Sequence, residues 1–187
     1  QFPSDWNLPN VYLLHGSLST EDMNKLYNHP KVKSFVSFTH GEGFGRPMLE
    51  ASMVGLPVIA SGWSGQMDFL SQEDSMLIGG ELKQVPQSQV WKDIIIPESQ
   101  WFVVNETQAY KAMNYCFENY DDVKAKSFNL MKTNRDKFTL DKMSEKLGEI
   151  VSPIVEKVPQ QVGLKLPKLK KVNNTIAPKI KLPKLKK

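Results

Sequence analysis

The chain contains one cysteine, Cys116, in a segment with helical spacing of apolar residues, so no disulfide can form within it. Small secreted domains stabilised by disulfides are therefore excluded, and a reducing compartment is the default. No apolar run approaches the roughly 20 residues that a membrane-spanning helix needs. The N-terminus also lacks the charged-then-apolar layout of a signal peptide. We predict a cytoplasmic protein in which Cys116 is a core residue and not a nucleophile.

Acidic residues are missing from the C-terminal end of the chain. Residues 157–187 hold ten lysines and no Asp or Glu, whereas residues 1–156 hold 14 Lys and Arg against 20 Asp and Glu, a net charge of −6. The residues 165–171 recur letter for letter as residues 181–187, without aromatic side chains. Such a segment buries too little surface to offset its ordering entropy, so we predict a disordered low-complexity tail over residues 158–187.

The basic tail leaves two roles open. It is either a solubilising appendage or a weak, salt-sensitive contact with an anionic surface, which would place the protein at the periphery of a membrane. A nucleic-acid-associated protein is disfavoured, because a body with a charge of −6 repels phosphate and the tail has no aromatic side chains for base stacking.

Short apolar runs alternate with segments of helical spacing through residues 11–70. Helix caps and turn residues separate them: Ser19 precedes one helical segment, and Pro47 and Gly55 stand at the two ends of another. Strands and helices in this alternation predict an α/β, Rossmann-like fold, a parallel sheet flanked by helices that binds ligands at the carboxyl ends of its strands. The predicted strands are residues 11–14, 32–38 and 57–60, and the predicted helical segments are residues 20–27, 47–54 and 67–70.

The signals after residue 70 are weaker. Residues 76–104 carry strand-like runs split by turn residues, which predicts a β-rich insertion. Three helices are predicted to follow and to pack on the edge of the sheet, at residues 107–120, 123–137 and 140–157. We therefore predict one domain over residues 1–157, followed by the tail.

Residues 40–50 read His-Gly-Glu-Gly-Phe-Gly-Arg-Pro-Met-Leu-Glu, a glycine-rich turn that opens a predicted helix. Glu42 lies on the turn and Glu50 in the first turns of the helix, so the two carboxylates project toward different parts of a ligand held there. Gly43 and Gly45 let the backbone approach a ligand closely and leave N–H groups free. The helix N-terminus adds a partial positive charge, which suits a diphosphate. This stretch predicts a site for a phosphorylated ligand; the alternative is two solvated acids near a helix start.

This stretch, continued by Ala51, residues 55–60 and Gly65, closely resembles the C-terminal, donor-binding domain of retaining GT-B glycosyltransferases, the group 1 enzymes with a family 4-like sequence. The resemblance is dense over residues 11–70, weaker to about residue 151, and absent from the tail. It implies binding of a UDP-, GDP- or ADP-sugar without a metal or other cofactor. It also implies transfer of a hexosyl group to an acceptor with retention of anomeric configuration.

The resemblance implies a role for each matching position. Glu50 would accept hydrogen bonds from the ribose hydroxyls, and Glu42 would be the catalytic carboxylate beside the donor sugar. Backbone N–H groups of the turn would hold sugar hydroxyls and the distal phosphate, and the loop at residues 14–16 would lie along the base. The residues implied for donor binding are Gly43, Phe44, Gly45, Glu50, His15, Gly16 and, in place of a family basic residue, Arg46.

Two parts of the family pattern have no counterpart in this sequence: a basic pair for the diphosphate and the N-terminal acceptor domain. We therefore expect a domain truncated at its N-terminal edge, which binds donor weakly and needs a separate polypeptide for transfer to an acceptor that the sequence does not identify. Arg46 either takes over part of the diphosphate contact or is an ordinary exposed arginine. The alternative function is a non-catalytic sugar-nucleotide-binding remnant that its basic tail tethers to an anionic surface.

Three features near the glycine-rich turn have two interpretations each. His40 is either a ligand contact or a turn residue. The turn at residues 61–65 either lies beside the donor or needs its glycines only for its shape. Trp63, Trp91 and Trp101 are predicted to be packing residues rather than platforms for a sugar ring.

Overall fold

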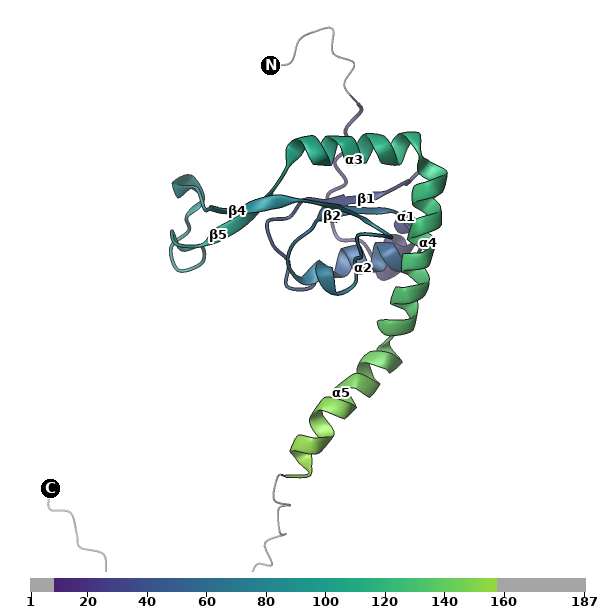
Figure 1. Cartoon of the computed structure of the whole chain (residues 1–187), viewed down its shortest axis with the longest axis vertical. Helices are drawn as coiled ribbons and strands as arrows, with labels where there is room; N and C mark the ends of the chain where they lie inside the picture. Colours follow the sequence, from purple (N-terminus) through teal and green to yellow (C-terminus); the bar gives the residue numbers. More distant parts are fainter. Residues whose placement is uncertain (1–8, 158–187) are drawn as a thin grey trace, which may run out of the picture. The chain divides into compact units, whose positions relative to one another are not determined.

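Three parallel strands form the central sheet of the computed structural model, which describes residues 9–157 (Figure 1). The strand order is β1-β2-β3, and the register pairs Val36 with Ile59 and Ile59 with Met76. The predicted α/β fold with a parallel sheet is confirmed, and the predicted tail at residues 158–187 lies outside the described residues. The strands are β1 (Phe35–Ser37), β2 (Val58–Ser61) and β3 (Met76–Ile78).

The central strand β2 is buried on both faces, because its side chains alternate between two apolar clusters. Val58 and Ala60 belong to one cluster with α2 (Arg46–Met53), whereas Ile59 belongs to a second cluster with α3 (Glu106–Glu118). Helices therefore cover both faces of the sheet (Figure 1). A strand covered on both sides is a continuous apolar run, which is why the sequence alone predicts it.

The helices α1 (Thr20–Tyr27) and α2 begin where their caps predict. The Ser19 hydroxyl accepts a hydrogen bond from the Asp22 N–H at 3.1 Å and so caps α1. α2 has a proline in its first turn and ends before Gly55, whose φ of 70° glycine adopts readily.

The strand predicted at residues 11–14 is wrong. These residues belong to no helix or strand, and their side chains are between 68% and 90% exposed. A strand needs a neighbour to take up its backbone hydrogen bonds, and no described strand pairs with this segment. The apolar composition suits a strand but does not supply a partner.

Residues 76–104 are only partly the predicted β-rich insertion. Their first strand, β3, belongs to the parallel sheet, whereas β4 (Gly80–Gln84) and β5 (Gln100–Val104) form an antiparallel hairpin. The connection of the hairpin contains a short 3-10 helix, η2 (Gln87–Gln89), and a single bridge between Trp91 and Ile95.

The helices after the hairpin are present, but their predicted packing on the sheet edge is wrong. Ala109 and Cys116 of α3 lie in one buried cluster with residues of β2 and β3, so α3 covers a face of the sheet. α4 (Tyr120–Lys137) packs on α2, where Asn134, 1% exposed, donates to the Ser52 hydroxyl at 2.8 Å. Helical periodicity identifies the apolar face of a helix but not the surface that it meets.

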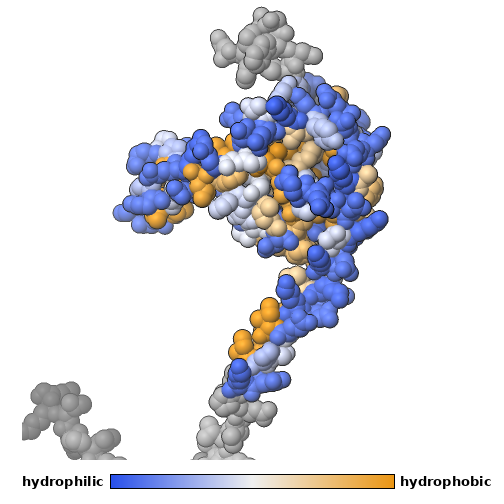
Figure 2. All heavy atoms as spheres, viewed as in Figure 1, coloured by the Kyte–Doolittle hydropathy of each residue, from blue (hydrophilic) through white to orange (hydrophobic). Residues whose placement is uncertain are grey.

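The third of these helices, α5 (Leu140–Val155), buries none of its side chains. Its apolar residues recur at helical spacing and leave an exposed stripe (Figure 2), formed by Leu140, Met143, Leu147, Ile150 and Ile154. The chain divides within this helix into two compact units, Gln1–Leu147 and Gly148–Lys187, so the predicted boundary after residue 157 stays a prediction. Over residues 9–157, no helix is long and apolar enough to cross a membrane.

Cys116 is 5% exposed, and burial raises the pKa of its thiol, although a hydrogen bond with Ser34 opposes this shift. The thiolate is the reactive form of cysteine. We therefore expect Ellman's reagent to react with the native chain more than about tenfold more slowly than with the chain in guanidinium chloride. Absorbance of the released thiolate measures both rates, and equal rates would contradict the burial of Cys116.

Candidate functional site

The glycine turn (residues 41–45) connects β1 to α2 at the carboxyl end of the parallel sheet. Gly45 closes the turn with φ 86° and ψ 45°, a left-handed conformation that suits glycine. Its carbonyl accepts hydrogen bonds from the N–H groups of Met48 and Leu49 at 3.0 and 3.2 Å. The Phe44 ring packs against Phe69, with 5.2 Å between centroids. These contacts fix how the turn enters the helix.

Three successive N–H groups of the glycine turn are unused. Among the residues that the structure describes, no acceptor is hydrogen-bonded to the N–H of Gly43, Phe44 or Gly45. These groups directly precede the N-terminus of α2, where the helix dipole favours an anion. The arrangement can donate to phosphate or hydroxyl oxygens of a ligand.

A second turn, the serine turn (residues 61–65), bonds to the main chain of Glu42. The Ser64 hydroxyl accepts from the Glu42 N–H at 3.1 Å and donates to the Glu42 carbonyl at 2.7 Å. The Gly65 N–H donates to the same carbonyl at 3.0 Å. Glu42 itself is half-buried. The sequence missed Ser64, because a serine before a glycine signals a turn and nothing about a bond to a residue 22 positions earlier.

Gln66 directly follows the serine turn and is fully buried, which the sequence did not suggest either. It lies in the 3-10 helix η1 (Gly65–Asp68), and its Nε2 donates to the carbonyl and the hydroxyl of Ser61, both at 2.9 Å. The Ser61 hydroxyl donates in turn to the Thr39 carbonyl at 3.0 Å. These bonds tie the carboxyl ends of β1 and β2 together, and with them the bases of both turns.

Glu50, in the second turn of α2, is paired with Arg46. The Arg46 Nε lies 3.1 Å from the Glu50 Oε1, and the two side chains are 82% and 40% exposed. An exposed pair of this kind contributes little to stability, so a ligand can displace it. The hydroxyl of Tyr27 is buried without a hydrogen-bond partner in the described part of the chain. Burial and then the charge of Glu50 raise the pKa of Tyr27, and Arg46 opposes them.

His40 joins the β4–β5 hairpin to the glycine turn. Its carbonyl accepts from the Phe102 N–H at 3.1 Å, and its Nδ1 lies 2.8 Å from the Phe102 carbonyl. The imidazole stacks on Trp101 with 4.6 Å between centroids, and Trp63 stacks on Phe102 at 5.6 Å. Trp63 and Trp101 therefore pack on other rings as predicted, and His40 has a structural role in placing the turn. The packing prediction is wrong for Trp91, whose side chain is 65% exposed.

His15 and Gly16 lie in the exposed segment before α1. No hydrogen bond or ion pair joins either residue to the glycine turn among residues 9–157, and no atom lies within 4 Å of the place of a Cβ on Gly16. The structure thus brings Glu42, Gly43, Phe44, Gly45, Arg46 and Glu50 into one region, and within residues 9–157 no hydrogen bond or ion pair links His15 or Gly16 to it.

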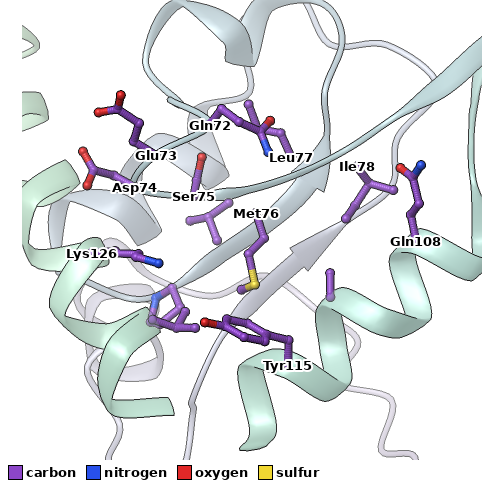
Figure 3. A pocket seen from close by; sticks show the side chains of 14 residues that line it. Gln72, Glu73, Asp74, Ser75, Met76, Leu77, Ile78, Gln108, Tyr115 and Lys126 are labelled. Atoms are coloured by element: carbon purple, nitrogen blue, oxygen red, sulfur yellow. The ribbon is translucent and has the colours of Figure 1, made fainter. Parts of the chain in front are cut away.

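A cavity of about 290 Å³ lies away from the glycine turn, between β3, α3 and α4 (Figure 3). On its rim, Lys126 pairs with Asp122 at 3.0 Å, and the Tyr115 hydroxyl donates to the same carboxylate at 3.1 Å. Both hydrogen bonds lower the pKa of Asp122. Within residues 9–157, no group of three or more His, Cys, Asp or Glu side chains could hold a metal ion. None of the residues that line this cavity belongs to either turn.

Residues 5–96 match the family described as glycosyl transferases group 1. The matched range includes both turns, α2 and all three strands of the parallel sheet, and with them every residue predicted to bind the donor. No curated protein matches the chain. The resemblance to group 1 glycosyltransferases inferred from the glycine-rich stretch is thereby confirmed.

Proposed function

Because residues 5–96 belong to the glycosyl transferases group 1 family and form a glycosyl transfer domain, we propose that the glycine turn and the start of α2 bind a nucleoside-diphosphate sugar. The proposed reaction transfers a hexosyl group to an acceptor with retention of anomeric configuration and without a metal. One observation carries the proposal: three free N–H groups and the Glu42 carboxylate share one turn directly before a helix. Phosphate oxygens need donors, and sugar hydroxyls can donate to a carboxylate.

Glu42 supports the sugar end of the proposed site. Its main chain is bonded to the serine turn through Ser64 and Gly65, so the backbone that carries its carboxylate needs little reorganisation when a sugar binds. The free N–H groups beside it would stabilise the negative charge that develops on the departing diphosphate. In this proposal, positioning and electrostatic stabilisation supply the catalysis.

Glu50 and Arg46 support the nucleotide end. The two oxygens of Glu50 can accept hydrogen bonds from neighbouring ribose hydroxyls once the pair with Arg46 opens, and the guanidinium is then free to reach the diphosphate. His15 and Gly16 are proposed to contact the base of the nucleotide. Their segment is exposed in the ligand-free chain, so it would have to close on the nucleotide.

Isothermal titration of the chain with UDP, GDP and ADP and with their glucose and mannose conjugates tests the proposal. We expect one nucleotide to bind with a dissociation constant of about 1 µM to 1 mM, and its sugar conjugate to bind more tightly. Glu42→Gln should remove the preference for the conjugate and leave the nucleotide affinity unchanged, because the amide loses the charge-assisted hydrogen bonds to the sugar.

Glu73→Gln is the matched control, since Glu73 lines the cavity beside β3 and not the glycine turn. Failure of every nucleotide to bind, or a conjugate preference that survives Glu42→Gln, would overturn the proposal. Binding of the conjugate without hydrolysis or transfer of a labelled sugar would instead favour the non-catalytic sugar-nucleotide-binding module.

A further inference from the structure

Ser64 has a backbone conformation that side chains avoid. Its φ of 79° and ψ of −157° lie in a region that glycine adopts freely and other residues adopt only under strain. A glycine stands at the next position, yet the strained conformation falls on the serine, which carries a side chain. Strained conformations persist where the surrounding structure imposes them, and they concentrate at functional sites. A role of the Ser64 hydroxyl would explain why serine, and not glycine, occupies this strained position.

The Ser64 hydroxyl bonds to both main-chain groups of one residue, Glu42. It accepts from the N–H at 3.1 Å and donates to the carbonyl at 2.7 Å. Glycine at this position would remove the strain, but it would also remove both hydrogen bonds. We propose that Ser64 is a positioning residue for the donor site, which fixes the backbone of Glu42 and, through it, the direction of the free N–H groups.

The planar peptide bond explains how one hydroxyl orients a ligand-binding group. The Glu42 carbonyl and the Gly43 N–H belong to the same trans peptide unit, so they point in opposite directions. The carbonyl points to Ser64 and Gly65, which both donate to it. The Gly43 N–H must therefore point away from the serine turn, and it has no acceptor within the described chain. Ser64 in this way presents the first of the three free donors to a ligand.

The inference rests on the proposed function, since it assigns Ser64 to the same donor site. Two variants separate positioning from stability: Ser64→Gly removes the hydroxyl and the strain, whereas Ser64→Ala removes the hydroxyl and keeps the strain. We expect both variants to weaken binding of the sugar conjugate about tenfold in titration calorimetry, because each loses two hydrogen bonds to the glycine turn. The thermal midpoint should stay within about 2 °C of wild type in Ser64→Gly and fall by several degrees in Ser64→Ala.

Ser71→Gly is the matched control, because the Ser71 hydroxyl also accepts a main-chain N–H, that of Asp74 at 3.2 Å, outside the proposed site. It should leave the affinity unchanged. If Ser64→Gly keeps the wild-type affinity, or if affinity follows the thermal midpoint across the three variants, Ser64 is a structural residue only and the inference is overturned.

Amide hydrogen exchange of the ligand-free chain separates this inference from the proposed function. The N–H groups of Glu42 and Gly65 form two of the three bonds between the turns, so Ser64→Gly should make both exchange about tenfold faster or more. Unchanged exchange at both residues overturns the positioning role whatever the chain binds. If Ser64→Gly exchanges faster but the wild-type chain binds no nucleotide, Ser64 holds the Glu42 backbone, and the donor site and the role of Ser64 in binding are refuted.

Discussion

Glu50→Ala is expected to weaken binding of the nucleotide and of its sugar conjugate by the same factor, about 100-fold or about 2.7 kcal/mol. A carboxylate that accepts two ribose hydroxyls makes charge-assisted hydrogen bonds, and these are common to both ligands. Glu42→Gln should instead affect the conjugate alone. Titration calorimetry on both variants therefore assigns the two carboxylates to the two ends of the ligand.

The ion pair between Arg46 and Glu50 complicates this variant, because the loss of Glu50 also releases the guanidinium. Arg46→Met is the necessary comparison. If Glu50 acted only by orienting Arg46, both variants would weaken binding equally, whereas direct contact with ribose predicts a larger loss for Glu50→Ala. Glu118→Ala, at the exposed end of α3, controls for a change in net charge. An unchanged nucleotide affinity in Glu50→Ala would remove Glu50 from the donor site.

The elements with the strongest local signals could be predicted from the sequence. Ser19 and Pro47 mark helix starts by mechanisms confined to a single turn, and the covered strand β2 shows as an unbroken apolar run. For the same reason the glycine turn could be located, because its glycines and its position before a helix are adjacent in the chain. Each of these features depends on residues within a few positions of one another.

Features that depend on pairing across the fold could not be predicted. Residues 11–14 have the composition of a strand but no partner, whereas the three residues of β3 have a partner that their composition does not reveal. The bonds around the site span long separations as well: Ser64 and Glu42 are 22 positions apart, and His40 and Phe102 are 62 apart. A sequence pattern gives the propensity of each segment, and the contact between segments is decided by packing.

The site therefore combines a predictable turn with an unpredictable support. The glycine turn carries the groups that could meet a ligand, but its position is set by three other segments: the serine turn through Glu42, the β5 strand through His40, and Phe69 through Phe44. A binding group held from several sides loses little entropy when a ligand arrives. Substitutions in these supporting segments should therefore change the affinity for the ligand, although the segments do not contact it.

Gly65→Ala is expected to be the most damaging single substitution in these supports. A Cβ at Gly65 would stand 2.2 Å from the Gly43 carbonyl oxygen and 2.8 Å from the Phe44 Cα, and both are backbone atoms that no rotamer change can move. The two turns must separate to admit it, which breaks the hydrogen bond from Gly65 to Glu42. We expect a loss of about 3 kcal/mol in the free energy of unfolding and of roughly 6–12 °C in the thermal midpoint.

Gly43→Ala provides the comparison on the facing turn, because a Cβ there meets no atom within 4 Å and should leave the free energy of unfolding nearly unchanged. Urea unfolding followed by circular dichroism measures both variants. Titration with the donor at a temperature below the thermal midpoint of Gly65→Ala should show weak or no binding by chains that are still folded. The separated turns no longer hold the Glu42 peptide in place. Because the predicted loss arises from one backbone contact between the turns, a wild-type midpoint for Gly65→Ala would mean that the turns do not meet, and the account of Ser64 and Glu42 would fail with it.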